Sequence, residues 1–204
     1  MAVQKFSKKE AISFGFEKAK QNWKFFIPIV LITLLVNMGP KLHTNPQDSG
    51  AVVFTSTIWT ILLWILRAVI EIGLISIALK FVDGKKAQIA DLLNYKPLIN
   101  YAIASVLYGL IMIAGLILLI IPGIIWAIKL QYYSYLIIDK NMGPIEALKK
   151  SWQITKGVKW QLFLLNILLV LINILGALAF GIGLFITIPT TMIACAKVYR
   201  KLTS

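Results

Sequence analysis

The segment from Asp139 to Trp160, DKNMGPIEALKKSWQITKGVKW, decides how the rest of the chain is interpreted. It carries five lysines, yet it lies between two long apolar segments. Gly143 and Pro144 predict a helix start, because proline in a first turn loses no hydrogen bond, and Gly157 predicts the end. We therefore expect a short basic helix that connects two membrane-embedded segments.

This predicted helix is amphipathic. Its apolar face carries Ile145, Leu148, Trp152 and Thr155 at three- and four-residue steps. Its polar face carries Glu146, Lys149, Lys150, Gln153 and Lys156. Tryptophan opposite lysine is typical of a helix that lies among lipid headgroups. A soluble helix packed on a core is the competing interpretation, but the apolar neighbours leave little soluble core to pack on.

The composition points to a membrane protein. The chain has 204 residues, of which 59% are hydrophobic, and a mean hydropathy of +0.82. A single cysteine (Cys195) excludes an internal disulfide, and a single histidine (His43) excludes a histidine-rich metal site. The net charge of +13 does not indicate nucleic acid binding, because the basic residues fall in short blocks beside apolar spans.

The N-terminal residues 1–24 predict a second basic helix that leads into an apolar segment. Ser7 and Glu10 form a capping-box pattern, and an apolar face follows. That face carries Ile12, Phe16, Ala19 and Trp23. We expect this helix to be retained rather than cleaved as a signal peptide, and Lys9, Lys20 and Trp23 to contact headgroups.

The fold class predicted is an all-α membrane helix bundle in a single domain, residues 1–204. The six expected spans are 25–38, 51–79, 98–121, 124–138, 160–177 and 184–198. Consecutive spans form three pairs. The two spans of a pair are separated by a polar loop at 39–50, by a break at Pro122-Gly123 and by a glycine-rich turn at 176–183, respectively.

Charge placement predicts the topology. Six spans put both termini on one side with segments 80–97 and 139–159, and this side collects 18 of the 21 lysines and arginines. Basic loops stay in the cytoplasm, so we expect a multi-pass protein of the plasma (inner) membrane with both termini cytoplasmic.

An internal repeat is also predicted. Residues 9–37 align without a gap on 145–173, an offset of 136, and 88–121 resemble a degenerate middle copy. Each unit would be an amphipathic helix followed by a membrane hairpin, in three parallel copies at about 7–80, 86–139 and 143–201.

The run from 122 to 163 resembles a widespread group of prokaryotic six-span membrane proteins, similar to the membrane domain fused to some glycerophosphodiester phosphodiesterases. The resemblance rests on Pro122-Gly123, Asp139, Gly143, Glu146-Ala147-Leu148, Ser151-Trp152 and Lys156-Gly157. It implies six spans. It implies no activity, because the sequence contains no phosphodiesterase catalytic domain.

Three charged residues fall well inside the predicted spans: Arg67, Glu71 and Lys129. Each costs roughly 2.5–3.5 kcal/mol at a helix centre, so they should face the bundle interior. They form either a polar site for an anionic headgroup or solute, or a structural Arg67–Glu71 pair. In the second case Lys129 reaches the interface or is held by tyrosine hydroxyls. The tyrosines concerned are Tyr132, Tyr133 and Tyr135.

No catalytic residue pattern is apparent, and we expect no cofactor, no metal and no enzymatic activity. The favoured hypothesis is a protein that organises anionic lipid or a membrane-protein partner at the cytoplasmic face through Lys149, Lys150, Trp152 and Lys156. The alternatives are a small-solute transporter or channel with a path along Arg67, Glu71 and Lys129, and, least favoured, an intramembrane enzyme.

Overall fold

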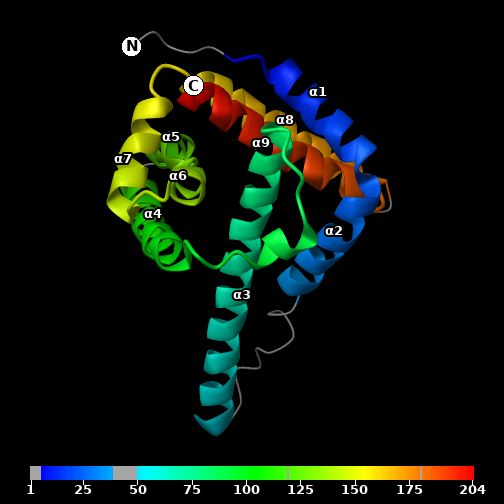
Figure 1. The fold of residues 1–204 in the computed structure, drawn as a ribbon. Coiled ribbons are helices and arrows are strands. Elements are labelled where there is room, and N and C mark those ends of the chain that lie inside the picture. Colours follow the sequence, from blue (N-terminus) through cyan, green and yellow to red (C-terminus); the bar gives the residue numbers. More distant parts are fainter. Residues whose placement is uncertain (1–5, 39–49, 119, 180) are drawn as a thin grey trace.

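The computed structural model describes residues 6–38, 50–118, 120–179 and 181–204, and these are helical with no strand among them (Figure 1). The predicted all-α class is therefore confirmed for the described residues. Residues 39–49 of the predicted outer loop, with His43, lie outside them. The helices are α1 (Lys8–Gln21), α2 (Trp23–Met38), α3 (Gly50–Val82), the 3-10 helix η2 (Ile89–Leu93), α4 (Leu98–Leu118), α5 (Ile120–Leu130), α6 (Tyr133–Lys140), α7 (Pro144–Ile154), α8 (Lys159–Leu178) and α9 (Leu184–Thr203).

Among the described residues, three helices are long and apolar enough to cross a membrane: residues Thr57–Val82 of α3, Leu98–Ile117 of α4, and α8. The α1–α2 pair, bent by 98°, would be a fourth if it crosses as one unit. Only 17–39% of the apolar windows in the three helices is buried, so most of their apolar side chains face outward, as a lipid environment requires. The count of six spans stays a prediction.

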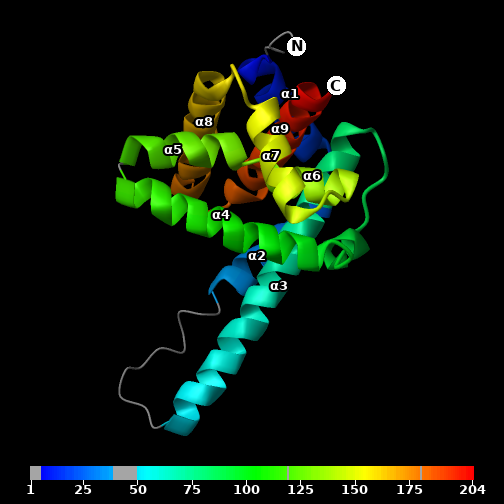
Figure 2. The same cartoon turned by 90° about the vertical axis from the view of Figure 1, so that its left-hand side faces the viewer.

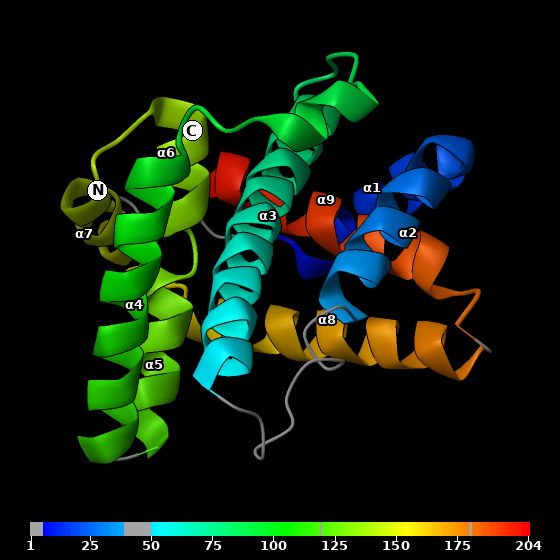
Figure 3. The same ribbon diagram turned by 90° about the horizontal axis from the view of Figure 1, so that it is seen from below.

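The helices form three hairpins, α2–α3, α4–α5 and α8–α9, which point in different directions. α3 projects well beyond the other helices, and the α4–α5 hairpin runs across its direction (Figure 2). Seen from below, α3 lies between α4–α5 on one side and α1 and α2 on the other (Figure 3). Of the short helices, α6 and α7 pack against each other and against α4, η2 packs on α3, and α1 packs on α9.

Small residues attach α1 to α9. Ala11, Gly15 and Ala19 are buried at four-residue steps, and a Cβ at Gly15 would collide with the Thr190 carbonyl oxygen of α9. Close approach of helix backbones through small residues is the usual mode of helix packing in membranes. Phe16, on the apolar face predicted from the sequence, is 49% exposed.

The α7 helix repeats this arrangement. Gly143 is its N-cap and Pro144 its first residue, which confirms the predicted start. Ala147, Ser151 and, just past its end, Thr155 are buried at four-residue steps, together with the larger Leu148.

The third short helix, η2, packs on α3. A Cβ at Gly73 would collide with the backbone of Leu92, so the two elements touch directly. An ion pair of 2.7 Å joins Lys80 Nζ to Asp91. Burial raises the pKa of the Asp91 carboxyl, but the hydrogen bonds from Lys80 and the Gln88 N–H outweigh it and lower the pKa.

The predicted break at Pro122-Gly123 is corrected by the structure. Both residues lie inside α5, because proline is tolerated in a first turn where its missing N–H has no helical partner. Gly123 instead lets α5 approach α4: a Cβ at Gly115 would lie 2.9 Å from the Gly123 Cα.

Candidate functional site

The predicted fourth span is broken between α5 and α6, and α7 fills the break. The Ser151 hydroxyl donates to the Lys129 carbonyl oxygen (2.9 Å) and accepts from the Tyr132 N–H (3.1 Å). The Thr155 hydroxyl lies 3.0 Å from the same Lys129 oxygen. These side chains satisfy backbone groups that a continuous helix would have paired internally. The backbone of Lys129 is thereby fixed against the buried face of α7.

Its side chain is fixed by an aromatic ring. The Lys129 ammonium lies 3.7 Å from the centroid of the Trp152 ring, a close cation–π contact between α5 and α7. Lys156 and Lys159 are near enough to repel it electrostatically. Among the described residues, none of the ion pairs involves a lysine of α5 or α7, Lys156 or Lys159. The cluster is therefore cationic without a compensating carboxylate.

A groove of about 590 Å³ opens beside this cluster, between α4, α5 and α7. Its walls are mostly apolar, with polar groups contributed by α7. The lining residues are Ile111, Ala114, Trp126, Leu130, Leu148, Lys149, Trp152 and Gln153. The volume lies in the range of small-molecule sites. Its chemistry suits a molecule with an apolar tail and an anionic head.

The expected joint site of Arg67, Glu71 and Lys129 is not formed in the described structure. The Arg67 guanidinium donates to the carbonyl oxygens of Asn37 (2.9 Å) and Val36 (3.4 Å), and no ion pair joins it to Glu71. The reason is that α2 ends at Met38, so its last carbonyls lack helical partners and carry the negative end of the helix dipole.

Glu71 and Lys129 each have separate surroundings. The Glu71 carboxylate lies near the Tyr101 hydroxyl on α4. Lys129 contacts the Trp152 ring rather than the hydroxyls of Tyr132, Tyr133 or Tyr135, which were the expected alternative. The three charged residues thus contact different elements.

The residues expected at the headgroups lie on α1, α2 and α7 or at their ends. Lys149, Lys156, Lys9 and Lys20 are exposed and Lys150 is half-buried. Trp23 is 50% exposed, with the Lys24 ammonium 5.7 Å from its ring centroid.

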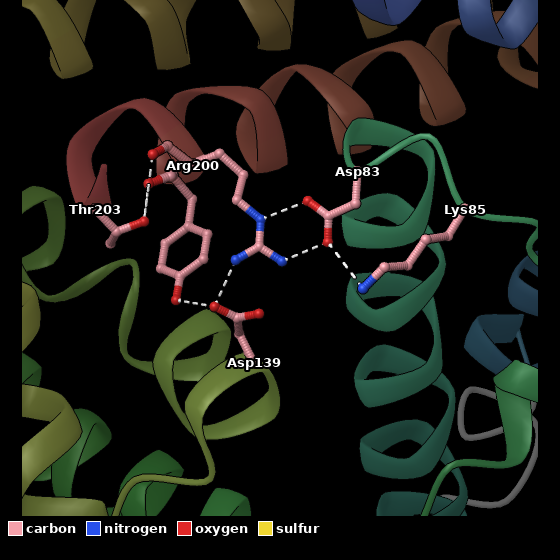
Figure 4. A network of polar contacts seen from close by, with 6 residues as sticks. Asp83, Lys85, Asp139, Arg200 and Thr203 are labelled. Atoms are coloured by element: carbon pink, nitrogen blue, oxygen red, sulfur yellow. Dashed lines mark hydrogen bonds and ion pairs between the residues drawn. The ribbon is translucent and has the colours of Figure 1, made fainter.

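A second charged cluster, not anticipated from the sequence, joins three helix ends (Figure 4). The Arg200 guanidinium on α9 binds both Asp83 carboxylate oxygens, at 2.7 and 2.8 Å, after the end of α3. Its remaining arm binds Asp139 on α6 at 2.6 Å, and the Tyr199 hydroxyl donates to the same carboxylate oxygen at 2.9 Å. We call Asp83, Asp139, Tyr199 and Arg200 the Arg200 junction.

The two carboxylates of the Arg200 junction stabilise the charged form of its guanidinium. Burial disfavours the charged guanidinium, but the hydrogen bonds to Asp139 and Asp83 outweigh it and raise the pKa of Arg200. Burial and the Asp139 hydrogen bond also raise the pKa of the Tyr199 phenol. The forked guanidinium suits carboxylates, and the cluster acts as a structural tie. The sequence offered one signal for this cluster. Acidic residues lie at the ends of two helical segments, and an arginine lies in the last turn of the third.

The described residues contain no group of three or more histidine, cysteine, aspartate or glutamate side chains that could hold a metal ion.

Comparison with known proteins finds relatives without an assigned role. Residues 60–204 match the sequence profile of a family described as "Protein of unknown function (DUF975)". The chain is 28% identical over 160 residues to Uncharacterized protein Rv2560 of Mycobacterium tuberculosis and to Uncharacterized protein Mb2590 of Mycobacterium bovis. The alignment covers 78% of this chain and 48% of each relative, so the chain spans about half the length of the curated relatives it matches. No solved structure matches.

Proposed function

Since the chain belongs to the DUF975 family of proteins of unknown function, we propose a function from its geometry: it is a non-enzymatic integral membrane protein that binds anionic lipid. The observation that carries the proposal is the Lys129 ammonium 3.7 Å from the Trp152 ring centroid, beside an apolar groove and without a carboxylate partner. The lysines would hold the anionic headgroup, and the groove would take an acyl chain.

Lipid binding agrees with how charge is distributed around the groove. Lys149 lines the groove, and Lys156 and Lys159 lie near Lys129. Each lysine near an anionic membrane surface contributes about 1 kcal/mol of attraction. A transport path would instead need Arg67, Glu71 and Lys129 along one cavity, and their separate partners favour lipid binding over transport.

The orientation is part of the same proposal. The charge bias supports six spans in the plasma membrane, with both termini and the Arg200 junction at the cytoplasmic face. A protein whose only cysteine is replaced (Cys195→Ser) and which carries Asn45→Cys or Asn141→Cys tests the orientation. An impermeant maleimide added to intact cells should label position 45 and not 141, and the reverse pattern contradicts this orientation.

Native mass spectrometry of the purified protein with phosphatidylglycerol tests lipid binding. Replacing Lys129 and Lys149 by glutamine should weaken binding by about 30-fold, because each lysine contributes roughly 1 kcal/mol. The control, Lys86→Gln with Lys96→Gln, removes the same charge at exposed sites on η2-flanking segments. Equal weakening by both pairs of substitutions would show that net charge alone determines lipid binding. That result would contradict binding in the groove.

A further inference from the structure

A second groove of about 700 Å³ lies between α1, α8 and α9. It is again mostly apolar, with two lysines of α1 in its lining. The lining residues are Lys8, Lys9, Ile12, Ser13, Phe16, Leu168, Ile172, Leu175, Thr187 and Thr190. We call it the α1 groove, and the groove beside Lys129 the α7 groove.

The two grooves use matching positions of α1 and α7. Ile12, Ser13 and Phe16 line the α1 groove, and the residues 136 positions later, Leu148, Lys149 and Trp152, line the α7 groove. Leucine matches isoleucine and tryptophan matches phenylalanine in these pairs. Phe16 is 49% exposed and Trp152 38%, so each groove has an exposed aromatic residue in its lining.

The buried faces of α1 and α7 match at the same offset. Ala11, Gly15 and Ala19 correspond to Ala147, Ser151 and Thr155, and all six residues are buried. Each stripe faces a hairpin that is not the one following it in the chain: α1 packs on α9, and α7 packs on α4, α5 and α6. Residues 136 positions apart therefore share similar burial as well as similar residue types.

We infer that the α1 groove is a second binding site for an anionic glycerophospholipid, equivalent to the α7 groove. This inference rests on the proposed function. The headgroup is held by Lys8 and Lys9 in the first turn of α1, which no ion pair among the described residues neutralises. The acyl chain lies along Ile12, Phe16 and the α8 residues. The charge of the opening selects an anionic lipid over a neutral one.

Counting bound lipids by native mass spectrometry tests the inference separately from the proposed function. With phosphatidylglycerol the unmodified protein should retain two lipids, and with phosphatidylcholine none at the same concentration. Lys8→Gln with Lys9→Gln should reduce the count to one, and so should Ser13→Trp, which fills the groove from an exposed position. Lys86→Gln with Lys96→Gln should leave two.

The outcomes separate the two claims. If the unmodified protein retains a single lipid, and only Lys129→Gln with Lys149→Gln removes it, the site in the α1 groove is overturned. The site in the α7 groove is then kept. Retention unchanged by either lysine pair overturns both sites. If the protein retains phosphatidylcholine as well as phosphatidylglycerol, any acyl chain can fill the grooves. That result overturns selection for an anionic lipid. Because Ser13→Trp adds no charge, its loss of one lipid would confirm the groove even if the α1 lysine pair altered folding.

Discussion

The Arg200 junction and the α7 groove are both built around a cation, and they differ in what compensates it. Arg200 binds two carboxylates, one of which also accepts from Tyr199. Lys129 binds an aromatic ring, and its charged neighbours are further lysines. A cation paired with two carboxylates stabilises the fold, whereas a cation without a carboxylate remains available to an external anion. Arg67 is an intermediate case, because its guanidinium donates to backbone carbonyl oxygens rather than to carboxylates.

The comparison predicts the largest loss of stability at Arg200. Arg200→Met should lower the free energy of unfolding by about 2–3 kcal/mol, because two carboxylates lose their partner. Fully buried pairs lose roughly 3–5 kcal/mol, and the Arg200 side chain is 29% exposed. Thermal unfolding in neutral detergent measures the change. Arg200→Lys keeps the charge but not the fork and should give an intermediate loss. Unfolding of Arg200→Met at the temperature of the unmodified protein would refute the structural role.

A smaller loss is expected at Arg67. Arg67→Met should cost about 1–2 kcal/mol, because carbonyl oxygens at the end of α2 lose a charged donor. Since no ion pair joins Arg67 to Glu71, the loss should add to that of Glu71→Gln within about 0.5 kcal/mol in a double-mutant cycle. A coupling above that value would restore the Arg67–Glu71 pair expected from the four-residue spacing.

The smallest effect is expected at the lysines near the α7 groove. Lys149→Gln with Lys156→Gln should change stability in neutral detergent by less than about 0.5 kcal/mol, since neither lysine has a carboxylate partner to lose. The same variant should lose part of the rise in unfolding temperature that phosphatidylglycerol gives the unmodified protein. A large destabilisation without lipid would place these lysines with Arg200 as structural residues.

Local signals in the sequence located the helices well. Ser7 caps α1, with its hydroxyl accepting from the Glu10 N–H, and Gly143-Pro144 begins α7. Each of these signals depends on the backbone of a few neighbouring residues, so it needs no tertiary information.

The packed faces could not be predicted from apolar periodicity. In α1 and α7 small residues are buried at four-residue steps, while Phe16 and Trp152 are exposed, although Leu148 is buried as well. In a lipid environment burial of apolar side chains does not favour protein over lipid, so close backbone approach decides the packing. The stripe Ala11, Gly15, Ala19 was visible in the sequence, but a rule suited to soluble proteins ranks it below Ile12 and Phe16.

The headgroup contacts expected at Trp152 and Lys149 stay a prediction. The sequence placed Trp152 on the apolar face and Lys149 on the polar face of one helix, and in the structure both line the α7 groove. The partner of Lys129 was not predictable, because it depends on how α7 returns against the break after α5. The same holds for Arg200, whose partners lie 61 and 117 residues earlier in the chain.

Because its partners lie far apart in the sequence, the Arg200 junction can form only late in synthesis. Asp83 leaves the ribosome 117 residues before Arg200, and Asp139 leaves 61 residues before it. At about 5–20 residues per second the two carboxylates wait several seconds for the guanidinium. We therefore expect the α2–α3 and α4–α5 hairpins to form before the guanidinium is available, so that the junction joins parts already in place.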